Sequence, residues 1–117
     1  MFTIIFPVLN ERLRLENGVT RTVEYLRSIA FEDYEIIIVD TGSEDETPQI
    51  AEKQCKKYDK VKYERINVRG VGAAFRRGVE VSHGDVVGYM DIDLSTNIRH
   101  LGEAIHLFGT QPEIQYI

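Results

Sequence analysis

The sequence predicts an α/β fold, with a mostly parallel sheet that carries helices on both of its faces. Short apolar runs alternate with segments of helical periodicity along the whole of the 117 residues. Runs such as EIIIV at residues 35–39 are apolar throughout, which is typical of strands that helices cover on both sides. With 43% hydrophobic and 28% charged residues, the composition indicates a folded chain, and the length fits one domain spanning 1–117.

The first half of the chain is expected to form three strands with two helices between them. The first strand stops at Pro7, because proline has no N–H to contribute to a sheet ladder. Apolar residues then recur at helical spacing between residues 19 and 30. Thr47-Pro48 predicts the start of the second helix, with threonine as its cap and proline in its first turn. The expected strands cover residues 2–6, 35–39 and 61–66.

The second half continues this alternation. A glycine-punctuated turn leads into a helix of small residues that runs to about Val81, and His83-Gly84 is expected to end it with a glycine cap. A polar residue at 95–97 is expected to cap a last helix, whose apolar positions recur up to Phe108. The expected strands cover residues 85–90 and 113–117.

Polar and acidic residues follow three of the apolar strands at their carboxyl ends. They are Asn10 and Glu11 after the first strand, Asp40 after the second, and Asp91 and Asp93 after the fourth. In open parallel sheets, the carboxyl ends of the strands form the binding crevice. We therefore expect these residues to meet at one rim, although the sequence spreads them over about 80 positions.

An acidic rim of this kind favours a divalent cation. Carboxylates gathered at one place repel each other unless a cation lies between them. Mg²⁺ or Mn²⁺ takes hard oxygen ligands and keeps positions open for substrate phosphates. Asp91 and Asp93 form an Asp-x-Asp pair at a strand end and are the candidate metal ligands. A solvated turn is the alternative for such a pair taken alone, but Asp40 in the equivalent place on another strand favours the metal.

Gly70-Val71-Gly72 opens a predicted helix, where backbone N–H groups and the helix dipole favour phosphate oxygens. Arg69 adds positive charge beside this turn. The dinucleotide fingerprint is not satisfied, because Phe75 stands where its third glycine belongs, and no P-loop sequence occurs. A tight turn that needs a positive φ is the alternative role for these glycines.

Charge and composition limit the partners and the compartment. A net charge of −5 argues against a nucleic-acid-binding surface. Six basic residues within 53–65 are interpreted as a solvated helix face and the strand after it, with contact to an anionic membrane surface as the alternative. Cys55, on the apolar side of its helix, is the only cysteine, which fits a reducing compartment such as the cytoplasm. No run of 18 apolar residues could span a membrane.

Four motifs occur in order along the chain: FPVLNE (6–11), IIIVDTGSEDET (36–47), RGVGAAFRRG (69–78) and GDVVGYMDIDLST (84–96). Together they resemble the amino-terminal half of family 2 glycosyltransferases, in particular the dolichyl- or polyprenyl-phosphate hexose synthases. The resemblance covers nearly the whole chain, and four ordered motifs are far more specific than any one of them.

The resemblance implies the Rossmann-like nucleotide-diphospho-sugar transferase fold, of GT-A type, and a site for a nucleotide-sugar donor. In this comparison Asp40 holds the base or ribose, and the turn before the third helix lies beside the nucleotide and sugar. Asp91 and Asp93 match the acidic pair that binds the metal, and Ser95 matches a position that adds a further ligand or water contact. The implied nucleotide-sugar-binding residues are Pro7, Asn10, Glu11, Asp40, Arg69, Gly70, Gly72 and Asp91.

The function that the resemblance implies is a metal-dependent glycosyltransferase, or the donor-binding half of one, acting in cell-envelope or glycolipid synthesis. It would transfer a hexose from a UDP- or GDP-sugar to an acceptor, with a polyprenyl or dolichyl phosphate as the candidate. Thr41 stands where many relatives carry a second aspartate, so base recognition is expected to differ. Because the family usually continues further, acceptor-binding residues and any general base are expected beyond residue 117, and the catalytic residues stay unassigned.

Two alternatives belong to other functional classes. One is a nucleotide-sugar-binding domain without catalysis. The other is a phospho-acceptor receiver domain, which has a similar length and α/β pattern but needs a lysine after its fifth strand, where this sequence has none beyond Lys62. Peripheral association with the cytoplasmic face of a membrane and a homo-oligomer are open expectations.

Overall fold

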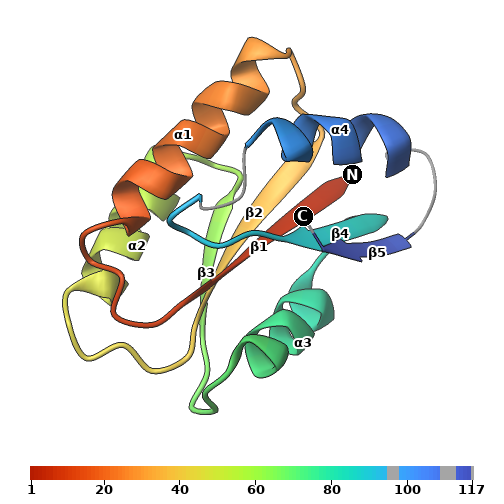
Figure 1. Ribbon diagram of the computed structural model, residues 1–117. Helices are drawn as coiled ribbons and strands as arrows, with labels where there is room; N and C mark the ends of the chain where they lie inside the picture. The colour runs from red at the N-terminus through yellow and green to blue at the C-terminus, as the bar shows by residue number, and fades with distance from the viewer. Residues whose placement is uncertain (95–97, 109–112, 117) are drawn as a thin grey trace.

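The computed structural model describes residues 1–94, 98–108 and 113–116, in which strands and helices alternate (Figure 1). The elements are β1 (Phe2–Val8), α1 (Leu15–Ser28), β2 (Tyr34–Asp40), α2 (Thr47–Lys57), β3 (Val61–Arg65), α3 (Val71–Val81), β4 (Val86–Tyr89), α4 (Arg99–Phe108) and β5 (Glu113–Tyr116). The expected order of elements is confirmed.

The strands form one parallel sheet in the order β3-β2-β1-β4-β5. The chain moves outward from β1 through β2 to β3 and then returns to the opposite side of β1 with β4. The strand order therefore reverses between β1 and β4, which is where open α/β sheets bind their ligands. The register places Val8 beside Asp40 and Asp40 beside Arg65, so the carboxyl ends of β1, β2 and β3 are level.

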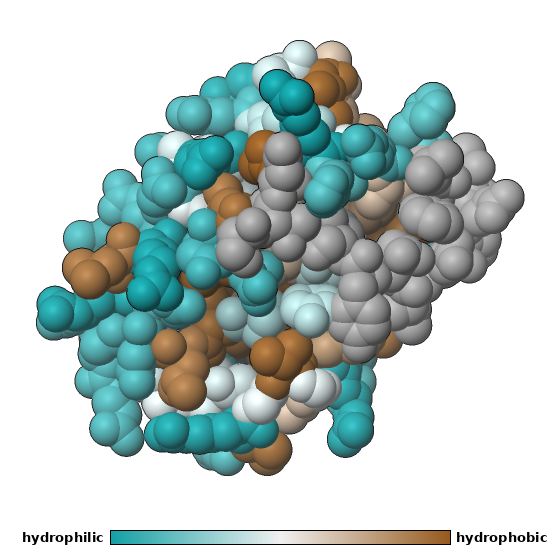
Figure 2. Space-filling view, in the orientation of Figure 1, coloured by the Kyte–Doolittle hydropathy of each residue, from teal (hydrophilic) through white to brown (hydrophobic). Residues whose placement is uncertain are grey.

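Helices cover the two faces of the sheet unequally. Helices α1, α2 and α4 lie on one face and α3 alone lies on the other (Figure 1). Alternate β1 residues serve the two sides: Ile4 packs beneath α1, whereas Ile5 packs against α3. The α1 sequence buries one stripe of residues at helical spacing, and its outer side forms a mainly hydrophilic surface (Figure 2). The parallel sheet with helices on both faces is thus confirmed.

Strand β1 continues past Pro7 to Val8, so the expected strand end at proline is wrong. The carbonyl of Ile5 accepts a hydrogen bond from Met90, and that of Val8 accepts one from Thr41. Alternate residues of β1 therefore face β4 and β2, and Pro7 faces the β4 side. Because the pairing of β4 with β1 ends at Ile5, no ladder bond is lost at the proline.

Two predicted helix caps are also wrong. Thr47 is the first residue of α2, and its hydroxyl accepts a hydrogen bond from the backbone N–H of Glu11 at 2.9 Å. Helix α3 ends with Ser82 in an extended conformation, and Gly84 instead donates its N–H to the Thr3 hydroxyl at 3.0 Å. In both places a long-range hydrogen bond replaces the local cap. The caps expected at 95–97 lie outside the described residues.

Candidate functional site

A cleft of about 260 Å³ lies at the carboxyl ends of β1, β2 and β4, next to the start of α3. Its lining residues are Pro7, Val8, Leu9, Glu11, Thr41, Gly70, Val71 and Asp91. Segments more than 80 residues apart thus form one wall, at the point where the strand order reverses. A larger hollow of about 910 Å³ between α1 and α4 is lined by none of the nucleotide-sugar-binding or metal-binding residues that the sequence predicts.

The segment that follows β4 presents two carboxylates on either side of a buried anchor. Asp91 and Asp93 are exposed, whereas Ile92 between them is only 2% exposed and packs in the main core. The backbone then turns: the N–H of Leu94 donates to the Asp91 carbonyl at 2.9 Å, and Leu94 has a φ of 56°. The alternation leaves both acidic side chains on the open side of the segment.

Glu11 is part of the same acidic rim. Burial raises the pKa of Glu11, Arg14 at 3.0 Å lowers it, and the negative charges of Asp93, Asp45 and Asp91 raise it again, with a net increase. The Glu11 carboxyl group therefore interacts electrostatically with both members of the Asp-x-Asp pair. The acidic groups after β1 and β4, far apart in the sequence, are close enough to repel one another.

Asp40 lies beneath the cleft, with its carboxylate fully buried. Its Oδ1 accepts hydrogen bonds from the N–H groups of Gly42 at 3.0 Å and Ser43 at 2.7 Å. Its Oδ2 accepts one from the Tyr63 hydroxyl at 2.7 Å and a longer one from Arg65 at 3.4 Å. Burial and the bond to Asp40 raise the pKa of Tyr63 to about 12. Asp40 thus fixes the turn that places Thr41 in the cleft wall, and its contact with a base or ribose stays a prediction.

Asn10 joins the loop after β1 to the loop after β2. Its backbone N–H donates to the Ser43 hydroxyl at 2.8 Å, and its side-chain oxygen accepts from the Glu44 N–H at 2.8 Å. Asn10 adopts a φ of 53°, a left-handed conformation that asparagine tolerates better than most residues. Asn10 therefore holds the two loops together and does not line the cleft.

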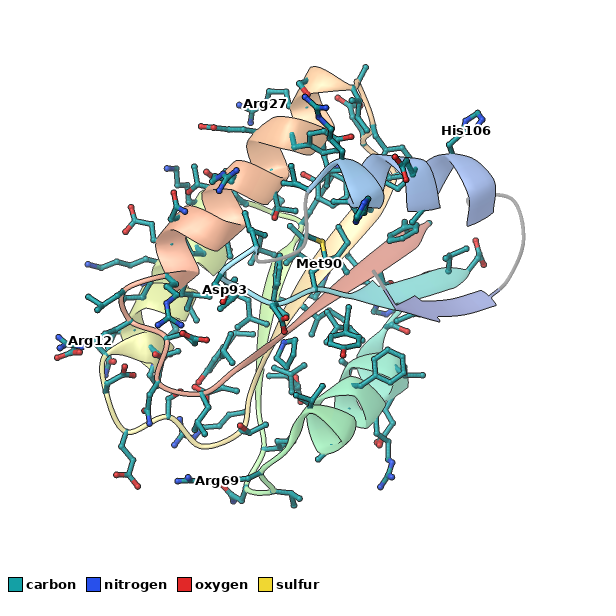
Figure 3. All side chains as sticks on the ribbon, in the orientation of Figure 1. Arg12, Arg27, Arg69, Met90, Asp93 and His106 are labelled. Carbon is teal, nitrogen blue, oxygen red and sulfur yellow. The ribbon has the colours of Figure 1, made fainter. Side chains whose placement is uncertain are left out.

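The turn before α3 forms the far side of the cleft. Gly70 has a φ of 115°, so a side chain at this position would be strained, and its carbonyl accepts the first helical bond from Ala74. Gly70 lines the cleft, whereas Gly72 is exposed and does not. Arg69 lies at the outer tip of this loop, away from Asp93 (Figure 3). Both alternatives for the glycines stay open, because a positive φ and proximity to the cleft coexist at Gly70.

The donor set fits a hard divalent cation. Asp91 and Asp93 offer exposed carboxylate oxygens, and Glu11 adds a third acidic group to the same rim. Within residues 1–94, 98–108 and 113–116, no three histidine, cysteine or acidic side chains are already gathered as a metal site. Magnesium and manganese sites in phosphate chemistry often use one or two carboxylates and complete their shell with substrate oxygens. Ser95, the other expected ligand, lies outside the described residues.

Some residues of the site escaped the sequence interpretation. Val8, Leu9 and Val71 line the cleft but look like ordinary apolar residues. Tyr63 and Arg65 donate hydrogen bonds to Asp40 from the neighbouring strand β3. Their spacing of two residues, which places both on the same face of β3, was the only sequence signal for this role.

Comparisons with known proteins agree with this geometry. The sequence model of glycosyl transferase family 2 matches residues 3–116. Glycosyltransferase AglD of Haloferax volcanii is 37% identical over 105 residues, which is 88% of this chain and 17% of that protein. Dolichyl-phosphate beta-glucosyltransferase of Mus musculus is 37% identical over 101 residues, which is 80% of this chain and 31% of that protein. The chain therefore spans less than a third of the length of these relatives.

Solved structures show the same fold. The crystal structure of Staphylococcus aureus TarS 1–349 has a TM-score of 0.69 and 26% identity, covering 90% of this chain and 31% of that one. Glucosyl-3-phosphoglycerate synthase of Mycobacterium tuberculosis, in complex with Mn²⁺, UDP and glucosyl-3-phosphoglycerate, has a TM-score of 0.70 and 23% identity, covering 95% of this chain and 40% of that one. With the fold, the cleft and the sequence match in agreement, the chain belongs to glycosyl transferase family 2.

Proposed function

We propose that this chain is the donor-binding part of a metal-dependent glycosyltransferase and that a nucleoside diphosphate sugar occupies the cleft at the carboxyl ends of the strands. The observation that carries the proposal is the convergence of Pro7, Glu11, Thr41, Gly70 and Asp91, from four segments of the chain, on one cleft. Support also comes from neighbours of the same fold that were solved with UDP and Mn²⁺ or with GDP-mannose and Mn²⁺.

The two sides of the cleft suit the two ends of such a donor. Pro7, Leu9 and Val71 supply apolar surface for the flat faces of a base or sugar ring. On the α3 side, the exposed backbone N–H groups of the first helical turn, next to Gly70, favour phosphate oxygens through hydrogen bonds and the helix dipole. Because Gly70 has no side chain, a phosphate can approach this backbone closely.

Asp91 and Asp93 are the residues that would hold Mg²⁺ or Mn²⁺. A bound ion would neutralise the charge of a departing nucleoside diphosphate, in the role of a Lewis acid. The chain contributes the position of the carboxylates, which Ile92 fixes by its burial in the core. Glu11 increases the negative charge of the rim and thereby favours a cation there.

The proposed acceptor is a polyprenyl or dolichyl phosphate, since relatives of this chain are dolichyl-phosphate glucosyl- and mannosyltransferases. A phosphate acceptor needs little help to lose a proton, so the reaction places a small demand on a general base. We assign no described residue to acceptor binding. In the part of the chain that the structure covers, no helix is long and apolar enough to cross a membrane. We propose peripheral association with the cytoplasmic membrane face and leave a homo-oligomer as an open expectation.

A nucleotide-sugar-binding domain without catalysis remains the second candidate, because the cleft alone accounts for binding and not for transfer. The receiver-domain alternative is excluded, because the model of glycosyl transferase family 2 matches residues 3–116. Hydrolysis or transfer of the sugar by the chain, measured with a radiolabelled donor and a short polyprenyl phosphate, separates a transferase from a binding domain.

Thermal unfolding with UDP and GDP, in Mn²⁺ and in EDTA, tests the proposed donor site. A nucleotide at a hundredfold excess over its Kd is expected to stabilise the chain by about 2.7 kcal/mol in Mn²⁺ only. Asp93→Ala is expected to abolish this stabilisation while the metal-free unfolding temperature changes little, because the side chain is exposed. Asp59→Ala, an exposed acidic residue after α2, is the matched control and should keep the full effect. Equal stabilisation in EDTA would contradict the metal role of Asp91 and Asp93.

A further inference from the structure

Helix α1 approaches the backbone of the segment that carries Asp91 and Asp93, here called the acidic segment (residues 91–94), at Gly18. Gly18 is buried in the first turns of α1, and a Cβ built on it would lie 2.2 Å from the carbonyl oxygen of Ile92. The same Cβ would lie 2.8 Å from the Ile92 Cδ1. Figure 1 shows the segment that follows β4 running up to α1. Only a residue without a side chain allows this approach.

The contact reaches the residue between the two candidate metal ligands. Ile92 stands between Asp91 and Asp93, so its carbonyl group belongs to the peptide unit that leads directly into Asp93. The Ile92 side chain packs in the same core cluster as Leu15 and Val19 of α1. The segment is therefore held on the α1 side by its side chain and by its backbone, while the acidic side chains point outward.

We propose that Gly18 is a positioning residue, which sets where Asp91 and Asp93 stand in the cleft by letting α1 close onto the Ile92 carbonyl. This inference rests on the proposed function and concerns a residue outside the cleft lining. Real Cβ atoms essentially never approach another atom within 3.0 Å, so any side chain at position 18 must displace α1 or the acidic segment by about 0.8 Å. Oxygen ligands of Mg²⁺ need bonds of roughly 2.0–2.1 Å in near-octahedral geometry, so a displacement of the acidic segment by this distance would weaken the binding of a metal ion.

The chain offers a matched control at the opposite end of the sheet. A Cβ built on Gly84, just before β4, would lie 2.3 Å from the Thr3 hydroxyl oxygen and 2.8 Å from the backbone carbonyl oxygen of Met1. Gly84→Ala therefore also creates a clash that involves backbone, but at the amino ends of β1 and β4, whereas Asp91 and Asp93 follow the carboxyl end of β4. A loss of stability alone would affect both variants alike, whereas a positioning role affects only Gly18→Ala.

Two measurements on the 117-residue chain test the inference. The first is the ¹H–¹⁵N spectrum without ligand, in which Gly18→Ala is expected to shift the amide signals of residues 91–94 and Gly84→Ala is not. The second is calorimetric titration with UDP in Mn²⁺, in which Gly18→Ala is expected to bind about tenfold to hundredfold more weakly, as a misplacement near 1 Å can cause. Gly84→Ala is expected to stay within twofold of the parent chain.

The outcomes separate this inference from the proposed function. If the parent chain binds no UDP, the proposed function fails, and the amide signals alone still decide whether Gly18 positions the segment. If Gly18→Ala binds like the parent, or leaves the amides of 91–94 in place, the inference is wrong and the function is untouched. If Gly18→Ala does not fold, Ile92→Val is measured in its place, because it removes the Cδ1 atom that packs over Gly18 without adding an atom to the contact. This single variant should fold, shift the amides of 91–94 and bind UDP more weakly than the parent, and unchanged amides with full affinity would overturn the inference.

Discussion

Asp40→Ala is expected to lower the free energy of unfolding by about 3–5 kcal/mol, the range typical when one partner of a buried charged cluster is removed. The substitution deletes a fully buried carboxylate that accepts short hydrogen bonds from Gly42, Ser43 and Tyr63. It leaves these donors without an acceptor in a site where water cannot easily replace it.

The size of the effect follows from the individual contacts. A hydrogen bond to a charged group contributes about 1.5–3 kcal/mol, and the three short bonds to Asp40 share one carboxylate, so their losses do not add fully. The fourth bond adds little, because it is 3.4 Å long and the Arg65 side chain is 42% exposed. Domains of this kind have a total stability of about 5–15 kcal/mol, so the change removes a large share of it.

Urea unfolding followed by far-UV circular dichroism is the suitable assay, since the sequence contains no tryptophan to report by fluorescence. Tyr63→Phe, which removes one of the short bonds, is expected to cost about 1.5–3 kcal/mol. In the Asp40→Ala background the same change should cost much less, because its partner is already gone. Tyr58→Phe, at the C-cap of α2 before β3 begins, is the control and should stay within about 0.5 kcal/mol of the parent.

A loss of under about 1 kcal/mol in Asp40→Ala, the level of an ordinary surface substitution, would refute a structural role for this carboxylate. The carboxylate would then not be the anchor of the turn. A full additivity of the Asp40 and Tyr63 substitutions would also contradict the direct bond between them.

Two carboxyl groups give opposite predictions for pH. Burial raises the pKa of Glu35, but hydrogen bonds from the His83 backbone and the Thr3 hydroxyl outweigh this effect, so the net pKa is lower than its ordinary 4.5. The ionised Glu35 therefore stabilises the fold at neutral pH, and this stabilisation is lost as the pH falls through the folded-state pKa. Glu35→Gln should therefore flatten the acid limb of stability, measured by urea midpoints from pH 7 downward. Glu11, whose pKa is raised by burial above all, favours its neutral form, so stability declines as the pH rises through its folded-state value. Glu11→Gln should stabilise the metal-free chain by less than about 1 kcal/mol at pH 7 and reduce its stabilisation by Mn²⁺ in thermal unfolding.

Much of the fold could be predicted from the sequence, because its signals are local. Fully apolar runs such as residues 35–39 mark buried strands, and the helical stripes mark the faces that pack on them. The rule for parallel sheets then brings Glu11 and Asp91 to one rim without any knowledge of the contacts. The caps at Thr47 and Gly84 were predicted wrongly, because their polar groups bond across the molecule and no local pattern records this.

The sequence could not separate residues that face the cleft from those that hold it. Asn10 and Asp40 carry side-chain oxygens that could equally bind a ligand. Only the structure shows that these oxygens accept hydrogen bonds from backbone N–H groups of the loops. In the sequence, Gly18 is only a residue of low helix propensity within a predicted helix. The structure shows that the Ile92 carbonyl oxygen lies where a side chain at position 18 would be. Such roles depend on the distance between elements far apart in the chain, which periodicity does not encode.

The polar residues of the rim therefore have two different roles, since some hold the loops together and others are exposed to a ligand. Asn10, Asp40 and Thr47 direct their side chains to the loops and join them by hydrogen bonds, so these loops are already ordered before any ligand arrives. Asp91 and Asp93 are exposed and stand on a segment fixed from behind. A ligand that binds here does not have to order the walls, and its binding energy goes to contacts with the ligand itself. This arrangement explains why the strongest effects on stability are expected at Asp40 and the strongest effects on binding at the acidic pair.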